Sequence, residues 1–184
     1  MSQLAAKQSN IDSNLLPHEQ EDENQFLTFN LTGDIFGINI MVIKEILEYG
    51  EITHIPMVPD YIRGVINLRG SVVPVIDLAL RINGTQAPVD RRTCIVIIEV
   101  EHDERTMDIG VVVDAVNEVL HIAKENIEPA PSFGAKIRTD FISGMGKIKE
   151  KFVVLLNVAR VLSIDELAGL SQIGNSSNPG EQLN

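Results

Sequence analysis

One hairpin pattern that occurs twice constrains the fold of this chain more than any other feature. In residues 55–78, two apolar runs typical of strands flank a turn that contains glycine, and a basic residue lies at the tip. A weaker copy of the same pattern spans residues 140–158. Two copies of one β-rich unit predict a scaffold built by duplication. Such a scaffold favours a binding surface over a catalytic cleft.

The repeat extends over most of the chain. Two early pairs of matched residues lie 73 positions apart: Gly37 with Gly110, and Pro56 with Pro129. Two later pairs lie 80 positions apart: Gly64 with Gly144, and Asp77 with Asn157. An insertion of seven residues in the loop around residues 132–138 accounts for the change of spacing. The alternative is that any two β-hairpins look alike.

Composition supports a β fold. Val, Ile and Leu dominate the apolar residues, Trp is absent, and there are six Phe and two Tyr. Because β-branched side chains favour strands, we predict an all-β chain with short helices. Each unit of about 60 residues matches a small five-stranded barrel, and has little core of its own. We therefore predict two barrels packed on a shared hydrophobic core.

The chain divides into a folded body between two polar tails. Residues 1–24 and 171–184 lack sustained hydrophobic periodicity, so we expect flexible tails there. Within the body, residues 25–170, we expect two intertwined subdomains, roughly 25–83 and 92–158, with an exchange of their terminal segments left open. Periodicity also predicts short helices over residues 41–48, 77–82 and 114–120. Pro74 predicts that its strand lies at a sheet edge or carries a bulge.

Charge and cysteine content exclude several classes of function. The formal net charge of −11 argues against binding nucleic acid or, without help, an anionic membrane surface. A single cysteine, Cys94, leaves no internal disulfide. The sequence has no secretory signal pattern and no apolar run long enough to cross a bilayer. We expect a cytoplasmic protein.

Catalytic motifs are not apparent. The four histidines have no paired metal-ligand spacing, and Cys94 lies in the most apolar run, where a thiol is usually inert packing. No glycine-rich phosphate loop occurs, and Gly144-Met145-Gly146 is interpreted as a close-packing or bulge position. We expect no enzyme activity, cofactor or metal.

Two arginines are the unusual feature of this acidic chain. Arg63 and Arg69 each precede a glycine, Gly64 and Gly70, and a basic group at a strand end can reach a carboxylate of a partner. The alternative is a solvated turn arginine. Ile43 and Leu47 are likewise either core residues or an exposed anchor for a partner helix.

The combined motifs resemble those of the CheW family of chemotaxis coupling proteins, over about residues 25–170. The resemblance is carried by the segments 36–38, 43–46, 55–70, 73–78, 109–114, 119–120, 127–131 and 141–146. It includes the Asn-Leu-Arg-Gly motif at residues 67–70. Any one segment is unspecific, but the combination is highly specific.

The resemblance implies two SH3-like barrels and a non-enzymatic adaptor. Its expected partners are the cytoplasmic hairpin tip of chemoreceptors, the regulatory domain of the histidine kinase CheA, and further copies of the adaptor in rings. Contact with the membrane would be indirect, through receptors at its inner face. By motif, the partner-binding residues would be Ile43, Glu45, Arg63, Gly64, Arg69, Gly110 and Val119.

Two other functions stay open at this stage. One is a CheV-like or kinase-derived regulatory fragment, although 184 residues leave no room for an appended receiver or kinase domain. The other is a barrel that binds a small molecule, which requires a pocket with a few converging polar groups. If the adaptor interpretation holds, Ile43→Asp is expected to damage docking more than secondary structure.

Overall fold

The computed structural model describes residues 23–131 and 138–162. The predicted tails, apart from residues 23 and 24, and most of the predicted insertion therefore lie outside the described residues. The strands and α-helices are β1 (Gln25–Leu31), β2 (Asp34–Asn39), β3 (Ile43–Glu48), β4 (Ile62–Leu68), β5 (Ser71–Asp77), α2 (Leu78–Asn83), β6 (Cys94–His102), β7 (Arg105–Val113), β8 (Ala115–His121), β9 (Ile127–Glu128), β10 (Ile142–Ile148), β11 (Lys151–Leu156) and α3 (Val158–Leu162). Three 3-10 turns, Ile40–Val42, Lys124–Asn126 and Thr139–Phe141, complete the set within this part of the chain.

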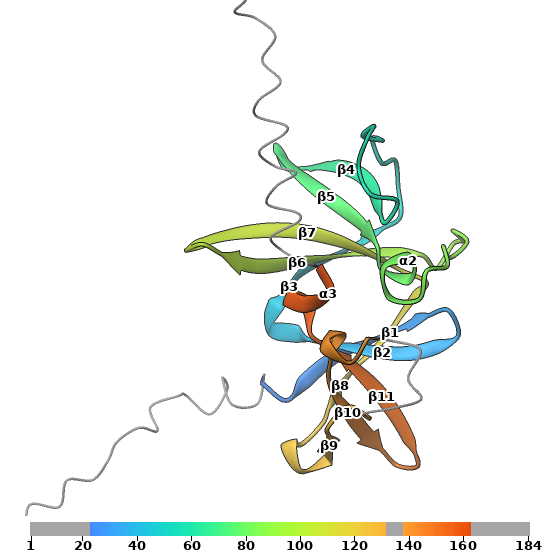
Figure 1. Cartoon of the computed structure of the whole chain (residues 1–184), viewed down its shortest axis with the longest axis vertical. Helices are drawn as coiled ribbons and strands as arrows, with labels where there is room; N and C mark the ends of the chain where they lie inside the picture. Colours follow the sequence, from blue (N-terminus) through green and yellow to red (C-terminus); the bar gives the residue numbers. More distant parts are fainter. Residues whose placement is uncertain (1–22, 132–137, 163–184) are drawn as a thin grey trace, which may run out of the picture.

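The strands form two sheets that exchange hairpins between the two sequence units. One sheet has the order β3-β6-β7-β5-β4, and the other has the order β8-β1-β2-β11-β10-β9. The hairpin β6–β7 of the second unit therefore lies among strands of the first unit, and β1–β2 lies among strands of the second. Figure 1 shows the two sheets at opposite ends of the body, with α3 between them. The prediction of an all-β fold with short helices is confirmed.

Matched residues of the two units occupy matched places. Gly37 pairs with Leu155 across a parallel ladder, and Gly110 pairs with Val75 across the other. The amide of Asp77 donates to the carbonyl of Tyr61 at 2.7 Å, and the amide of Asn157 donates to Phe141 at the same distance. Because both kinds of pair repeat at the sequence spacing of the units, the duplication is visible in the backbone geometry.

Each barrel has its own interior, and a third and larger core joins them. Val73, Val75, Ile95, Ile97 and Val112 fill the first interior. The second interior holds Phe26, Ile122, Val153 and Leu155. The shared core takes residues from both sheets and both helices, including Leu27, Phe36, Ile76, Val96, Ile98, Val111, Leu156 and Leu162. Alternate residues of β6 thus face two different cores, which explains its nearly continuous apolar sequence.

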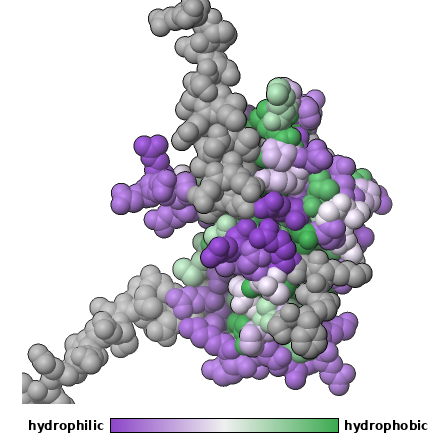
Figure 2. Space-filling model, viewed as in Figure 1, coloured by the Kyte–Doolittle hydropathy of each residue, from purple (hydrophilic) through white to green (hydrophobic). Residues whose placement is uncertain are grey.

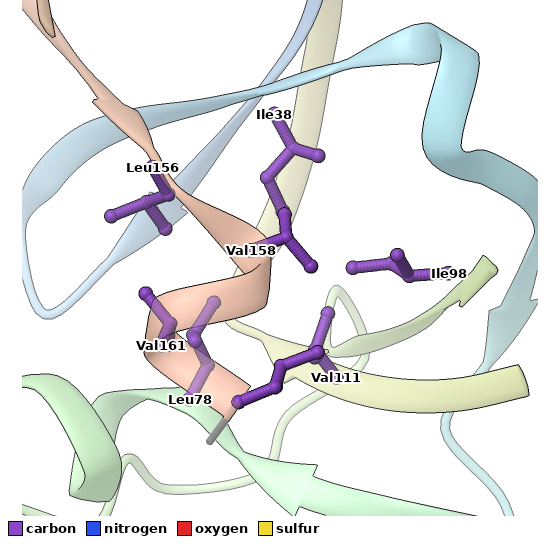
Figure 3. A pocket seen from close by; sticks show the side chains of 8 residues that line it. Ile38, Leu78, Ile98, Val111, Leu156, Val158 and Val161 are labelled. Carbon is purple, nitrogen blue, oxygen red and sulfur yellow. The ribbon is translucent and has the colours of Figure 1, made fainter. Parts of the chain in front are cut away.

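Packing of the shared core leaves almost no free space. Figure 3 shows side chains from β2, β6, β7, β11, α2 and α3 converging on one point between the sheets. The cavity at this point has a volume of about 10 Å³ and an entirely apolar lining. A water molecule needs polar partners as well as space, so this gap is a packing defect and cannot hold a ligand.

The helix predicted over residues 41–48 is wrong. The segment forms a short 3-10 turn, Ile40–Val42, followed by strand β3. Ile43, Ile46 and Leu47 fit a helical period over eight residues, but the same residues alternate in burial along the strand. Two observations favour the strand: the β-branched side chains, and the antiparallel ladder with β6.

The helix predicted over residues 114–120 is also wrong, because β8 occupies residues Ala115–His121 and pairs with β1. Asp114 does not cap a helix; its carboxylate accepts a hydrogen bond from the amide of Thr32 at 2.7 Å. The third helix is confirmed as α2, where the Asp77 carboxylate accepts from the amide of Leu80 at 3.0 Å.

Pro74 lies in an interior strand and not at the predicted edge. β5 is flanked by β4 and β7, but its ladder with β7 begins only at Val75. Val65, the residue opposite Pro74, exchanges both of its backbone hydrogen bonds with Thr53 at 2.9 Å. The missing amide proton of Pro74 therefore breaks no ladder bond. The bulge lies in the partner strand, between Ile62 and Gly64.

The hairpin β6–β7 is longer than its counterpart β1–β2. Its ladder runs out to the pair His102 and Arg105, and its turn places Asp103 and Glu104 at φ values of 49° and 61°. Figure 1 shows this hairpin projecting beyond the rest of its sheet, and Figure 2 shows hydrophilic side chains covering the projecting end. This end is therefore a solvated turn.

Candidate partner-binding surface

A two-point ion pair joins β3 to the tip of the β4–β5 hairpin. The Arg69 guanidinium donates through Nη1 and Nη2 to the two carboxylate oxygens of Glu45, and both distances are 2.9 Å. Arg69 lies in the turn with φ of 51°, next to Gly70, whose amide donates to the Asn67 side chain at 2.9 Å. This bidentate geometry is specific to arginine, since a lysine ammonium cannot bridge both oxygens in one plane.

The ion pair is open to the outside. The Arg69 side chain is 75% exposed, while that of Glu45 is 26% exposed. An exposed apolar side chain, Val72, lies near the start of β5, three residues after Arg69. Ile46 is also exposed, but it follows Glu45 directly on β3 and therefore points to the opposite face of the strand. A fixed charge pair with an exposed apolar group nearby suits a protein partner more than a small molecule.

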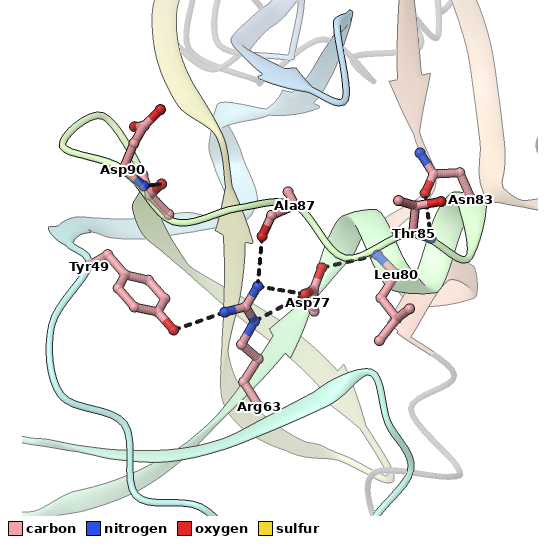
Figure 4. A network of polar contacts seen from close by, with 9 residues as sticks. Tyr49, Arg63, Asp77, Leu80, Asn83, Thr85, Ala87 and Asp90 are labelled. Carbon is pink, nitrogen blue, oxygen red and sulfur yellow. Dashed lines mark hydrogen bonds and ion pairs between the residues drawn. The ribbon is translucent and has the colours of Figure 1, made fainter.

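Arg63 lies inside the molecule, unlike Arg69. Figure 4 shows its guanidinium surrounded by protein groups. It donates to Asp77 Oδ2 through Nε at 3.0 Å and Nη2 at 2.7 Å, to the Tyr49 hydroxyl at 3.0 Å, and to the Ala87 carbonyl at 3.3 Å. The side chains of Arg63 and Asp77 are 12% and 2% exposed. These contacts tie β4 to the start of α2 and to the following loop.

Electrostatics keep Arg63 charged in this position. Burial alone lowers the pKa of the guanidinium, but the hydrogen bonds and charge of Asp77, with a smaller contribution from Tyr49, raise the pKa above its ordinary value. Four hydrogen bonds direct this largely buried guanidinium at groups of its own chain. We therefore leave Arg63 out of the proposed docking surface.

The two glycines of the predicted site lie in one row across the first sheet. The register joins Gly64 to Val75, Val75 to Gly110, Gly110 to Ile97, and Ile97 to Glu45. A Cβ atom on Gly64 would overlap the carbonyl of Thr53, and one on Gly110 would lie 2.8 Å from the Ile95 side chain. Both glycines therefore permit close packing inside the barrel, and Glu45 is the end of the row that reaches the surface.

Ile43 and Val119 lie on different barrels and differ in exposure. Ile43 is half-buried and packs against the shared core, opposite Ile98, because a bulge between Ile43 and Glu45 turns the two side chains to different faces of β3. Val119 belongs to the other sheet, where β8 forms an edge and pairs Val119 with Leu27. Its side chain is 49% exposed, so it remains available for contact on the second barrel.

Ion pairs around Lys44 were not predicted from the sequence. The Lys44 ammonium lies 3.0 Å from an Asp108 oxygen and 3.3 Å from a Glu99 oxygen, joining the outer faces of β3, β6 and β7. Hydrogen bonds from Lys44 to Asp108 and then to Glu99 raise the pKa of the ammonium. The bulge between Ile43 and Glu45 breaks the strand period at Lys44, so alternation in the sequence did not indicate these contacts.

Features expected of other functions are not found in the described part of the chain. Within residues 23–131 and 138–162, no group of three or more His, Cys, Asp or Glu side chains is placed to hold a metal ion. No helix in the described part is long and apolar enough to cross a bilayer. Cys94 is half-buried, and burial, followed by the charge of Glu48, raises the pKa of its thiol despite an opposing hydrogen bond from the Val116 backbone.

Two cavities were candidates for a small-molecule site, and both lack the size or the lining that such a site needs. Besides the gap in the shared core, a shallow hollow of about 240 Å³ lies at the turn of β1–β2 and is lined mainly by polar residues such as Asn30, Asp90, Arg92 and Asp114. Sites for small ligands are typically about 300–1,000 Å³ and mostly apolar. Neither space meets these requirements.

Comparison with known proteins identifies the family. The model of the CheW-like domain matches residues 25–166. The chemotaxis protein CheW of Klebsiella aerogenes is 34% identical over 152 residues, covering 83% of this chain and 89% of that protein. CheW of Bacillus subtilis is 36% identical over 116 residues, covering 63% and 71%. The CheV3 protein of Helicobacter pylori is 30% identical over 131 residues, which cover 70% of this chain and 41% of CheV3.

A solved structure has the same fold. The crystal structure of the scaffolding protein TtCheW from Thermoanaerobacter tengcongensis superimposes with a TM-score of 0.68 at 32% identity, over 76% of this chain and 87% of that one. The prediction of two SH3-like barrels is confirmed, as is the family resemblance drawn from the motifs. The chain therefore belongs to the CheW family, whose members are chemotaxis scaffold proteins.

Proposed function

We propose that this protein couples chemoreceptors to the histidine kinase CheA as a non-enzymatic adaptor. The single observation that carries the proposal is the CheW-like match over residues 25–166, which includes both barrels and their shared core. Through receptors, the adaptor is recruited to signalling arrays at the inner face of the membrane. Its partners are the receptor hairpin tip and the kinase regulatory domain, and further copies of the adaptor join it in rings.

The first barrel supplies the surface for one of these partners. Arg69 and Glu45 form its polar centre, and Val72 supplies exposed apolar area near the start of β5. Arg69 stays accessible while its orientation is fixed, so a partner carboxylate or carbonyl meets a preorganised donor. Val119 contributes from the second barrel.

Gly64 and Gly110 act indirectly in this proposal. Their missing side chains allow β4, β5 and β7 to close tightly behind Glu45. Ile43 likewise fixes β3 against the shared core. These residues position the surface and do not contact the partner.

Co-sedimentation of the purified full chain with a cytoplasmic receptor fragment, and separately with the kinase, tests the proposal. We expect saturable binding to both partners. Arg69→Glu is expected to weaken binding to at least one partner without lowering the melting temperature. Failure of the parent protein to bind either partner would overturn the adaptor role.

A further inference from the structure

The tip of the β10–β11 hairpin gathers positive charge on a strongly acidic chain. Lys147, Lys149 and Lys151 lie within five residues that also include one acid, Glu150, so the tip has a net charge of +2, whereas the formal net charge of the whole chain is −11. All three side chains are exposed. Among the residues that the structure describes, none of the three lysines has a carboxylate partner, although Lys44 and Lys124 each do. The tip is therefore a local exception to the charge of the molecule.

An exposed aromatic side chain accompanies the lysines. Phe152 is 46% exposed and lies directly opposite Lys147 in the ladder, so both side chains point to the same face of the hairpin. Lys149 occupies the turn with φ of 57°. Lys151 pairs with Ile148, which packs on the interior of the second barrel, so Lys151 lies at the rim of that barrel. Charge thus surrounds an apolar contact point.

The first copy of the hairpin shows that the fold does not require this charge. At the equivalent positions, 80 residues earlier, stand Asn67, Arg69, Ser71 and Val72. Arg69 has a turn conformation like that of Lys149, with φ of 51°, but its charge is satisfied by Glu45. The second hairpin has the same strand register as the first. In place of one paired arginine it carries three lysines, for which the described residues provide no carboxylate partner.

We propose that the β10–β11 tip binds a carboxylate-rich segment of a partner protein, with an apolar residue of that segment against Phe152. An acidic partner is repelled by most of this chain, and the tip is a place of opposite sign that can steer its approach. An anionic membrane is the less favoured occupant, because it would bring a broad negative surface against a molecule of net charge −11. This surface lies on the barrel opposite Glu45 and Arg69 and is independent of the coupling surface proposed above.

Photo-crosslinking in the full chain tests this assignment. The photoreactive residue p-benzoylphenylalanine replaces Phe152 in one variant and Val72, its counterpart in the first barrel, in a control variant. After irradiation in cells that carry the native array, crosslinked peptides are identified by mass spectrometry. We expect adducts from position 152 on a partner segment rich in Asp and Glu, and their loss when Lys147→Glu, Lys149→Glu and Lys151→Glu are combined. Position 72 is expected to give no adduct on that segment.

A binding measurement with a synthetic peptide of alternating Glu and Leu supplies a second readout. The triple lysine variant is expected to weaken binding by on the order of tenfold or more, and raising salt from about 50 mM to about 300 mM is expected to weaken binding to the parent protein. Asn67→Glu with Ser71→Glu, on the other hairpin, is the matched control and is expected to leave the affinity unchanged. If the triple Glu variant fails to fold, the Lys→Gln triple variant serves in its place.

Several results would overturn the proposal. These are adducts only to lipid, adducts only to the acidic run of this chain at residues 19–23, the absence of any adduct at position 152, or peptide binding that the lysine substitutions leave intact. Stronger binding to vesicles that contain phosphatidylserine than to the peptide would assign the tip to membranes instead.

Discussion

Glu45 on β3 and Arg69 in the β4–β5 turn come from elements that are not neighbours in the sheet, and their side chains meet in a two-point ion pair with both N–O distances at 2.9 Å. The Asn-Leu-Arg-Gly turn thereby acquires a fixed orientation relative to β3. The pair defines the surface that we propose as the centre of partner recognition.

Reversal of this charge pair is expected to change binding more than stability. Arg69→Glu and Glu45→Arg should each weaken binding of the receptor fragment or the kinase, because each places like charges together and removes the oriented guanidinium. Since Arg69 is 75% exposed, the loss of unfolding free energy should stay within about 0–1 kcal/mol. Titration calorimetry and thermal denaturation measure the two effects.

The double variant Glu45→Arg with Arg69→Glu is the control for the pair. It restores opposite charges in exchanged positions, so stability should return to that of the parent. Binding should remain weak if a partner reads the guanidinium at position 69. Full binding by either single variant would contradict a recognition role for the pair.

Arg63→Ala is expected to destabilise the fold strongly. Removal of the guanidinium leaves the carboxylate of Asp77 buried with one partner amide, that of Leu80, and breaking a buried ion pair in this way costs about 3–5 kcal/mol. Chemical denaturation measures this loss. Arg69→Ala is the matched exposed control, and an equal loss in both variants would contradict the contrast between buried and exposed arginines.

Two isoleucines of β3 provide a matched comparison of core and surface. Ile43→Asp places a carboxylate against the shared core and is expected to lower the melting temperature sharply or prevent folding, contrary to the expectation from the sequence. Ile46→Asp changes a side chain that is 43% exposed and is expected to leave the fold intact. Circular dichroism of both variants decides between these roles, and a folded Ile43→Asp protein would contradict the packing described here.

Substitution of the barrel glycines is expected to act through packing. Gly64→Ala forces a Cβ into the Thr53 carbonyl at a φ of 144°, and Gly110→Ala meets the Ile95 side chain. Both are expected to lower the unfolding free energy by more than about 1 kcal/mol. Gly50→Ala is the control, because its Cβ would meet no atom within 4 Å. Equal stability of all three variants would contradict the role of Gly64 and Gly110.

Much of the fold was predictable because the residues that repeat at fixed spacing are ones that the backbone geometry requires. Gly37, Gly110, Gly64 and Gly144 occupy close-packed or bulged positions, and Asp77 caps α2 as its place after β5 indicated. The alternation of apolar and polar residues predicted the strands of the hairpins correctly. Glycine spacing, helix caps and strand alternation depend on local backbone geometry, so they can be predicted from the sequence.

Two aspects of the architecture depended on contacts between distant residues. Residues 41–48 fit the periods of both a helix and a strand, and only the ladder with β6 selects the strand. The hairpin exchange was not specified either, because nothing local in β1–β2 indicates which barrel it joins.

Only part of the site was visible in the sequence. The motif identified both arginines but not their difference in burial. Arg63 is buried against Asp77 and Tyr49, whereas Arg69 pairs with Glu45 at the surface. Sequence position alone could not separate the buried arginine from the exposed one. The exposure of Ile46 and Val72 was missed for the same reason.

Reconstitution of the three-component complex tests the central claim most directly. Receptor fragment, kinase and this protein are mixed at fixed concentrations, and the amount of kinase that sediments with the receptor is measured with and without the adaptor. The account predicts that kinase is recruited only when the parent protein is present, and that recruitment falls with Arg69→Glu at an unchanged melting temperature. Kinase recruitment that does not depend on this protein would contradict its role as the coupling element.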